Sequence, residues 1–283
     1  MYIGGENALL SGIVADMHTH SENSHDSECA VEDMCLSQIC KGTKIMAVTD
    51  HCDIFRYKER DIFKPILTSY NTVKELNQKY KDKCLLLSGV EIGEGFWHPD
   101  VCKEIIDFLP YDVILGSVHC TRYKKFANPY SVIDFSSFAK EDIERYLSTY
   151  FDDMITMINS LDIDILAHLT CPIRYICGKY GKQVDMSLFE EKIETILSLI
   201  IKNEIALEIN TSSYDLLNDF MPSERILKRF YDMGGYLITL GSDAHKKDDA
   251  SKNFDDAIKI IKDIGYKSIF YYQNRKPHEI TLV

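Results

Sequence analysis

Histidine and carboxylate side chains recur at short spacing near the start of the chain. The stretch DMHTHSENSHDS, residues 16–27, holds three histidines and two aspartates within twelve positions. On an extended strand, Asp16, His18 and His20 would point to the same side. Imidazole and carboxylate groups arranged in this way bind divalent metal ions, but a solvated polar loop can have the same composition. This stretch alone therefore leaves both interpretations open.

Further side chains of the same kind follow other apolar runs along the chain. Including the first run, the metal-capable residues at the run ends are His18, His20, Asp50, His51, Glu91, His119, His168, Asp243 and His245. A lone histidine at a strand end is more often a hydrogen-bonded core residue, and Glu91 or Asp243 could be a cap or a turn residue. The coincidence is informative, because burying so many such groups together without a cation would cost several kcal/mol per group.

The expected ligands are imidazoles and carboxylates without thiolates. This mixture suits zinc, manganese or iron better than magnesium or calcium, which prefer oxygen ligands. Cys52 and Cys120 directly follow His51 and His119. Adjacent residues of a strand point to opposite sides, so we expect both thiols to pack away from the site.

The elements that must position these residues alternate between short apolar runs and helical segments. The runs span 12–20, 45–51, 84–93, 112–120, 164–170, 205–212 and 236–245. The segments with helical spacing span 30–42, 64–80, 139–161, 186–204, 223–235 and 254–265. Nearly continuous hydrophobic strands are typical of a parallel sheet covered by helices. The pattern favours one barrel related to (β/α)₈, with an open doubly wound sheet as the alternative, and in a barrel the strand ends converge on one face.

Composition excludes several classes of protein. The net charge of -12 at pH 7 would repel a polyanion, so nucleic acid is not the expected partner unless bound metals reverse the local sign. Nine cysteines without a CxxC pair indicate reduced thiols. The start of the chain does not resemble a secretory signal, and no stretch is apolar enough to span a membrane. We expect a soluble cytoplasmic protein without a dinucleotide or P-loop motif.

The motifs DMHTH, VTDH, GVEIG, GSVHC, LAH and GSDAH occur in this order between residues 16 and 245. Together they resemble the PHP (polymerase and histidinol phosphatase) family of metal-dependent phosphoesterases. The stand-alone histidinol-phosphate phosphatases of that family are the most similar, because they share the HTHxxxSxDS start, the pair Arg174 and Tyr175 after LAH, the LEIN strand and the NRKP sequence at 274–277. The resemblance implies an α/β protein with a distorted (β/α)₇ TIM-like barrel as a single domain over residues 1–283.

The resemblance also implies two to three divalent ions, zinc, manganese or iron, and their ligands. The first ion would be held by His18, His20, Glu91 and Asp243. The second would be held by Glu91, which bridges, with His119 and His168. The third would take His51, His245 and a ligand from the opening loop. Many relatives have a histidine at that loop position, but here it is Asp26, which we expect to bind, with His25 as a solvated neighbour. Asp16 and Asp50 are expected to hold an imidazole in one tautomer.

The reaction implied is hydrolysis of L-histidinol phosphate to L-histidinol and inorganic phosphate by a metal-bridging hydroxide. Arg174, six residues after His168, is expected to clamp the phosphate with its guanidinium fork. Asn210 and Arg122 are further candidates for binding substrate. Asp243 and His245 join Arg174 as catalytic candidates, and either His245 or a metal-bound water could protonate the leaving group.

Two other classes of function remain open from the sequence. The chain could be a PHP phosphoesterase acting on another small phosphate or on nucleic acid ends, although its acidic balance disfavours the latter. It could also be a non-catalytic metal-binding barrel, which would be expected to lack a ligand or the arginine. The expected partner is a small-molecule phosphate ester, and the sequence gives no indication of the oligomeric state.

Overall fold

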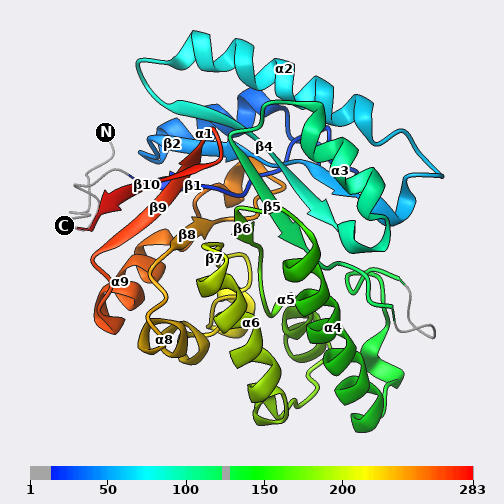
Figure 1. Cartoon of the computed structure of the whole chain (residues 1–283). Helices are drawn as coiled ribbons and strands as arrows, with labels where there is room; N and C mark the ends of the chain where they lie inside the picture. Colours follow the sequence, from blue (N-terminus) through cyan, green and yellow to red (C-terminus); the bar gives the residue numbers. More distant parts are fainter. Residues whose placement is uncertain (1–13, 123–127, 283) are drawn as a thin grey trace.

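A parallel sheet surrounded by helices forms the centre of the molecule (Figure 1). The computed structural model describes residues 14–122 and 128–282. The sheet has the strand order β1-β2-β4-β5-β6-β7-β8, and β3 pairs with β4. These strands span Ala15–Asp16 (β1), Ile45–Val48 (β2), His51–Asp53 (β3), Leu85–Gly93 (β4), Val113–Ser117 (β5), Ile165–Leu166 (β6), Ala206–Asn210 (β7) and Ile238–Gly241 (β8).

The sheet closes where its last strand meets its first. The backbone N–H of Met17 donates a hydrogen bond to the carbonyl of Leu240 at 2.8 Å. The backbone N–H of Asp243 donates to the carbonyl of His18, also at 2.8 Å. These bonds join β1 to β8, which confirms the predicted barrel and excludes the open doubly wound sheet.

Each of the seven predicted apolar runs contains a strand of this barrel, in agreement with the (β/α)₇ pattern. The strands are shorter than the runs, and residues 12 and 13 of the first run lie outside the described residues. The second run continues beyond β2 into β3, which lies beside β4 with His51 opposite Glu91. This extension brings two of the predicted ligands side by side.

The longer helices cover the outside of the barrel, and two short ones lie in the loops that follow β6 and β7. The helices span Val31–Cys40 (α1), Phe63–Tyr80 (α2), Pro99–Phe108 (α3), Lys140–Ser160 (α4), Cys171–Ile173 (α5), Glu190–Lys202 (α6), Tyr214–Leu217 (α7), Glu224–Asp232 (α8) and Phe254–Ile264 (α9). The six predicted helical segments contain α1, α2, α4, α6, α8 and α9. Helix α3 was not predicted, although it begins with a proline at a favourable position and buries Cys102 and Ile105.

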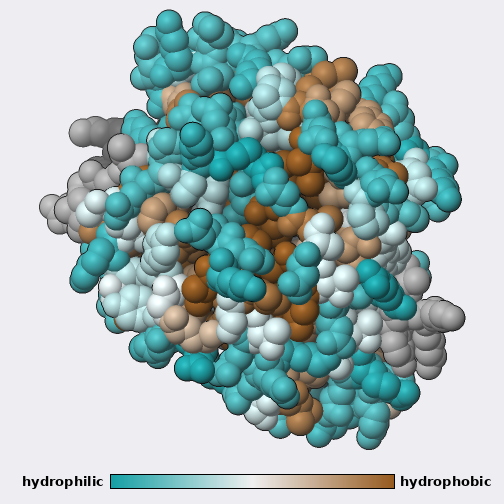
Figure 2. Space-filling model, in the orientation of Figure 1, coloured by the Kyte–Doolittle hydropathy of each residue, from teal (hydrophilic) through white to brown (hydrophobic). Residues whose placement is uncertain are grey.

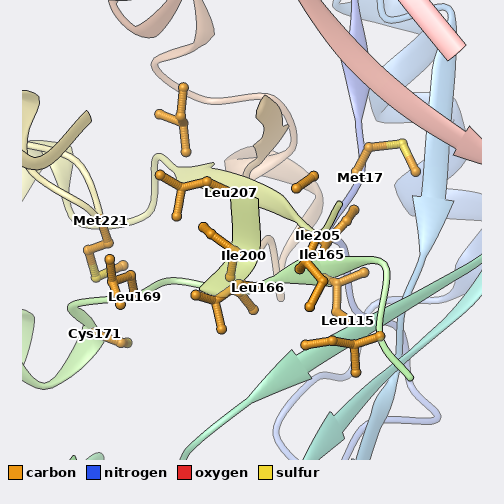
Figure 3. Packing of buried hydrophobic residues seen from close by; sticks show 14 of the residues in the cluster. Met17, Leu115, Ile165, Leu166, Leu169, Cys171, Ile200, Ile205, Leu207 and Met221 are labelled. Atoms are coloured by element: carbon orange, nitrogen blue, oxygen red, sulfur yellow. The ribbon is translucent and has the colours of Figure 1, made fainter. Parts of the chain in front are cut away.

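The core lies inside the barrel and between the barrel and its helices. Figure 3 shows side chains from β5, β6, β7 and α6 packed in one cluster, among them Leu115, Ile165 and Ile200. All three are completely buried. Tyr146, Tyr150 and other residues at helical spacing on α4 extend this cluster outwards. Figure 2 shows apolar residues in the middle of one face, around β5 and β6, surrounded by hydrophilic residues.

A C-terminal hairpin covers the end of the barrel where the strands begin. Its strands, Ser268–Gln273 (β9) and Lys276–Thr281 (β10), pair antiparallel. The turn residues Asn274 and Arg275 have φ of 51° and 61°, as a two-residue hairpin turn requires. The Arg275 guanidinium contacts the Asp164 carboxylate just before β6 and donates to the Asp162 carbonyl at 2.9 Å. The NRKP sequence therefore forms a turn that ties the C-terminus to the barrel.

None of the helices in residues 14–122 and 128–282 combines the length and the hydropathy that a membrane-spanning segment requires.

Candidate metal centre

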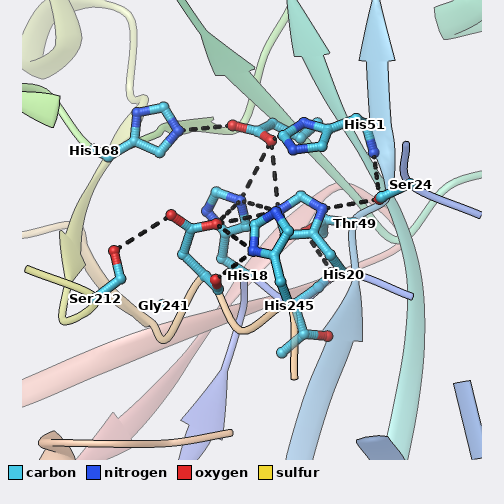
Figure 4. Close-up of polar contacts among 12 residues, drawn as sticks. His18, His20, Ser24, Thr49, His51, His168, Ser212, Gly241 and His245 are labelled. Atoms are coloured by element: carbon cyan, nitrogen blue, oxygen red, sulfur yellow. Dashed lines mark hydrogen bonds and ion pairs between the residues drawn. The ribbon is translucent and has the colours of Figure 1, made fainter. Parts of the chain in front are cut away.

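The metal-capable side chains converge at the carboxyl ends of the barrel strands (Figure 4). Each lies in a barrel strand or within a few residues after one, and six different strands contribute, as the barrel geometry predicts. His18 and His20 follow β1, His51 begins β3, Glu91 lies in β4, His119 follows β5, His168 follows β6, and Asp243 and His245 follow β8.

Glu91 lies at the centre of the cluster with its two oxygens turned to different histidines. Its Oε1 lies 2.8 Å from Nε2 of His168 and 3.2 Å from Nε2 of His119. Its Oε2 lies 2.8 Å from Nδ1 of His51 and 3.5 Å from Nε2 of His18. The side chain is completely buried. This position suits a carboxylate that bridges two cations.

A second group of ligand atoms lies beside Glu91. Nε2 of His18 is 3.0 Å from Nε2 of His20, and Nε2 of His20 is 3.2 Å from Oδ1 of Asp243. These three residues could hold one ion. The ring of His20 also stacks on the rings of His51 and His245, and both of their centroids lie 4.2 Å from its own.

The loop after β1 brings Asp26 rather than His25 between the remaining histidines. Oδ1 of Asp26 lies 3.5 Å from Nε2 of His51 and 3.3 Å from Nε2 of His245. His25 is 40% exposed, and its Nδ1 faces Oδ2 of Asp53 at 3.6 Å. His25 also falls within one group of possible ligands with Asp26 and His51. The geometry therefore favours Asp26 and leaves His25 at the rim.

The ring nitrogens and carboxylate oxygens of the cluster are arranged better for binding a metal ion than for hydrogen bonding to one another. Nδ1 of His51 and Oε2 of Glu91 are only 2.8 Å apart, yet within the described residues neither has a hydrogen-bond partner of acceptable geometry. Buried polar atoms are normally paired, because an unpaired one loses its hydration without compensation. A cation between such atoms removes this cost, and their imidazole and carboxylate chemistry suits zinc, manganese or iron.

Mutual contacts also set the charges of the cluster. Burial alone would raise the pKa of Glu91, but the imidazoles of His119 and His18 hold it well below its ordinary value. Burial lowers the pKa of His20 well below its ordinary value, and the neighbouring His51 lowers it further. Glu91 is therefore a carboxylate and His20 a neutral imidazole, which are the forms that bind a metal.

Two of these residues have backbone conformations that are unfavourable for a residue with a side chain. His168 has φ of 28° and Asp243 has φ of 53°. Such strain persists only where the surrounding structure imposes it, and it concentrates at functional sites. The strain therefore falls at two strand ends that carry candidate ligands.

Three side chains absent from the predicted site hold imidazole rings of the cluster. Glu208 on β7 lies with Oε1 2.7 Å from Nδ1 of His18. Oγ of Ser24 lies 3.1 Å from Nδ1 of His20, and Oδ1 of Asp53 lies 3.3 Å from Nδ1 of His119. Each contact uses one ring nitrogen and leaves the other to face the cluster. The sequence signal for Glu208 was a charged residue inside the apolar run IALEIN.

The prediction that Asp16 and Asp50 hold imidazole rings is wrong. Both are buried, but Asp16 accepts from the hydroxyl of Ser242 at 2.6 Å and Asp50 accepts from the hydroxyl of Ser69 at 2.6 Å. Asp50 reaches a ring only through Ser24, whose hydroxyl donates to it at 2.7 Å. The two aspartates therefore anchor the loops that carry the ligands.

A cavity opens above the cluster, and Arg174 contributes to its wall. Residues from both the cluster and the loops line it: His25, Asp26, His51, Asp53, Phe55, Arg56, His119, Pro129, Tyr130, Ser131, His168, Cys171, Arg174, Tyr175, Asp243 and His245. Nη1 of Arg174 donates to Oγ of Ser212 at 3.0 Å, which directs the guanidinium over the site. Oγ of Ser212 also lies 3.4 Å from Oδ2 of Asp243.

Asn210 and Arg122, the other candidates for binding substrate, do not line this cavity. Asn210 is completely buried and donates to Oε2 of Glu208 at 3.2 Å, so it supports the protein side of the cluster. Nε of Arg122 lies 3.6 Å from Oδ1 of Asp153, and its guanidinium stacks 4.6 Å from the ring centre of Phe96. Asn210 is therefore directed into the protein, whereas Arg122 lies half exposed beside Asp153.

Comparisons with known proteins agree with this geometry. A model of the PHP domain matches residues 16–212, more than half of the chain. A probable histidinol-phosphatase from Clostridium acetobutylicum is 29% identical over 92% of this chain and 97% of its own length. A histidinol-phosphatase from Lactococcus lactis is 27% identical over 92% of this chain and 95% of its own length.

The fold also matches a solved structure. The crystal structure of histidinol phosphate phosphatase from Lactococcus lactis, complexed with zinc, L-histidinol and phosphate, superposes with a TM-score of 0.74. The match has 22% sequence identity and covers 94% of this chain and 98% of the other. The resemblance read from the ordered motifs is thus confirmed by the family match, by the relatives and by the fold. The chain belongs to the PHP domain family.

Proposed function

We propose that the chain is a metal-dependent phosphomonoesterase that hydrolyses L-histidinol phosphate to L-histidinol and inorganic phosphate. The observation that carries this proposal is the convergence of imidazoles and carboxylates below a cavity whose wall contains Arg174. The curated relatives named above are histidinol-phosphatases, and they align over almost their whole length. A non-catalytic metal-binding barrel, the other alternative, would be expected to lack one of the metal ligands or Arg174.

The cluster would hold about two to three divalent ions, zinc, manganese or iron. Each ion would draw on a different part of the ligand set. The first would use His18, His20, Glu91 and Asp243; the second Glu91, His119 and His168; the third Asp26, His51 and His245. Such ions, when bound, make water a nucleophile near neutral pH and neutralise phosphoryl oxygens.

The residues of the chain would orient the phosphate and keep the ligands in the required form. Arg174 can bind two phosphoryl oxygens with its planar fork, and Ser212 restricts its motion. The ring of His245 was a candidate for either ligand or general acid. Its Nδ1 lies 2.9 Å from the Asp243 carbonyl, which only accepts, so Nδ1 carries the proton. Nε2 is then free to bind a metal, and this favours the ligand role.

The remaining wall of the cavity suits the cationic part of the substrate. Phe55, Tyr130 and Tyr175 present aromatic rings to the cavity. An ammonium group and an imidazole favour such surroundings, whereas a nucleic acid backbone would meet the acidic chain unfavourably. Phe55 lies in the short turn Ile54–Arg56, which directly follows β3.

The experiment that tests the proposal measures phosphate release by protein loaded with zinc or manganese. We expect L-histidinol phosphate to be hydrolysed with a higher kcat/KM than a generic aryl phosphate, and single-stranded DNA to be left intact. Preference for another small phosphate or for DNA ends would indicate a different activity of the PHP family. Metal binding without hydrolysis of any of the three would identify a non-catalytic barrel.

A further inference from the structure

We propose that Glu208 is a positioning residue of the metal centre, which fixes the ring of His18 and the backbone of His168 in the conformations that metal binding needs. This inference rests on the proposed metal-dependent function. Glu208 is not itself a ligand candidate, because both of its oxygens are turned to protein groups. Its role would be to decide which nitrogen of His18 is available.

The first oxygen of Glu208 sets the tautomer of His18. Glu208 is 1% exposed, and its Oε1 lies 2.7 Å from Nδ1 of His18. A carboxylate only accepts hydrogen bonds, so Nδ1 must carry the proton. Nε2 then keeps its lone pair, and this atom faces Nε2 of His20 at 3.0 Å and Oε2 of Glu91 at 3.5 Å. A hydrogen bond from the far nitrogen to a carboxylate also makes an imidazole a stronger ligand.

The second oxygen holds the end of β6. Oε2 of Glu208 accepts from the backbone N–H of His168 at 2.6 Å and from Nδ2 of Asn210 at 3.2 Å. His168 is the residue with φ of 28°, a conformation that needs external support. One carboxylate therefore connects the ligand histidine after β1 with the ligand histidine after β6.

Glu208 and His18 come from strands on either side of β8, and a glycine in β8 leaves room for their side chains to meet. Strand β8 lies between β7 and β1, and Gly241 is its last residue. A Cβ at Gly241 would overlap Oε1 of Glu208 and would lie 2.8 Å from Cβ of His18. A side chain at this position would thus displace the carboxylate from the ring. Glycine is required at this position because the Glu208 carboxylate approaches the backbone closely. The backbone of Gly241 is not in the left-handed region, so its conformation does not require glycine.

Replacement of Glu208 by glutamine separates this role from simple core filling, because the two side chains have the same shape. The Oε2 position faces the backbone N–H of His168, which can only donate, so the amide oxygen would take this place. The amide nitrogen would then face Nδ1 of His18 and donate to it. This arrangement moves the ring proton to Nε2 and blocks the nitrogen that faces the metal.

The test compares zinc binding by the wild-type chain, Glu208→Gln and Asp164→Asn. Asp164 is a matched control, since it is a buried carboxylate of the same barrel that accepts from the backbone N–H of Ile114 at 2.7 Å, at the opposite end. We expect Glu208→Gln to weaken zinc binding by about 10- to 100-fold with unchanged circular dichroism. Asp164→Asn should lower the melting temperature and leave zinc affinity unchanged.

A spectroscopic measurement on the wild-type chain keeps the proposal testable if Glu208→Gln does not fold. With ¹⁵N-histidine and bound zinc, His18 should give an Nδ1–H signal that is absent from His18→Gln. Assignment of the His18 proton to Nε2, or wild-type zinc affinity in a folded Glu208→Gln, would overturn the proposal. Neither measurement uses a substrate, so failure to hydrolyse L-histidinol phosphate would count against the proposed function alone.

Discussion

Oδ1 of Asp26 lies 3.3 Å from Nε2 of His245, across the mouth of the barrel. The adjacent residue His25 turns its Nδ1 towards Asp53 instead. Asp26→Ala should therefore remove a ligand, whereas His25→Ala should not. We expect the first variant to lose about one metal ion per chain, measured by elemental analysis after reconstitution with zinc. His25→Ala serves as the control, and greater metal loss from it than from Asp26→Ala would reverse the assignment.

Arg174→Ala should affect phosphate binding without affecting the metals. The guanidinium lines the cavity but contacts Ser212 rather than a ligand imidazole. We expect kcat/KM to fall by about 10²–10³-fold, inhibition by inorganic phosphate to weaken, and metal content to stay at the wild-type level. Arg122→Ala tests the alternative, and it should change kcat/KM little because Arg122 faces Asp153. Equal metal loss from Arg174→Ala would exclude the clamp role.

Asp153 should make stability depend on pH in mildly acidic solution. Burial raises its pKa from the ordinary value of 3.8 to about 6, although the backbone N–H and the charge of Arg122 oppose the rise. The folded protein therefore binds more protons than the unfolded chain between these values, and this group's contribution to the free energy of unfolding falls as pH rises through that window. This decrease in the free energy of unfolding should be of the order of 2 kcal/mol, and Asp153→Asn should remove it. Denaturant titrations of both proteins at several pH values would check this, and parallel pH profiles would contradict it.

Arg275→Ala should lower stability and leave the chemistry intact. The change removes the partner of the buried Asp164 carboxylate and the bond to the Asp162 carbonyl, at the end of the barrel away from the site. We expect the free energy of unfolding to fall by about 1–3 kcal/mol. Lys103→Ala is the control, since it removes only an exposed pair with Asp107 and should cost less than about 0.5 kcal/mol. Thermal melts and phosphate release at 25 °C would separate the two effects.

The positions of the predicted ligands were accessible from the sequence because of one geometric rule. Parallel strands of a barrel all end on the same face, so His18, Glu91 and Asp243 had to lie near one another once their runs were identified as strands. The choice between Asp26 and His25 needed the structure, because adjacent loop residues have no periodicity that fixes their direction.

The contacts behind the ligands could not be predicted in the same way. Glu208 reaches past another strand to His18, and the sequence gives neither the strand order nor the space at Gly241. The hairpin formed by β9 and β10 was missed because β9 is only partly buried and β10 is mostly exposed, so neither forms a continuous apolar run. The single domain over residues 1–283 and the roles of the individual site residues stay predictions.

The barrel closes where its first strand meets its last, and the ligand cluster lies across this junction. His18 and His20 follow β1, whereas Asp243 and His245 follow β8. An ion held by His18, His20 and Asp243 would link the first and last strands at a point where the sheet is otherwise closed by hydrogen bonds. During synthesis the residues that follow β8 would emerge long after those that follow β1. This ion could then be bound only after β8 has been synthesised, and a chain truncated before Ile238 would be unable to hold it.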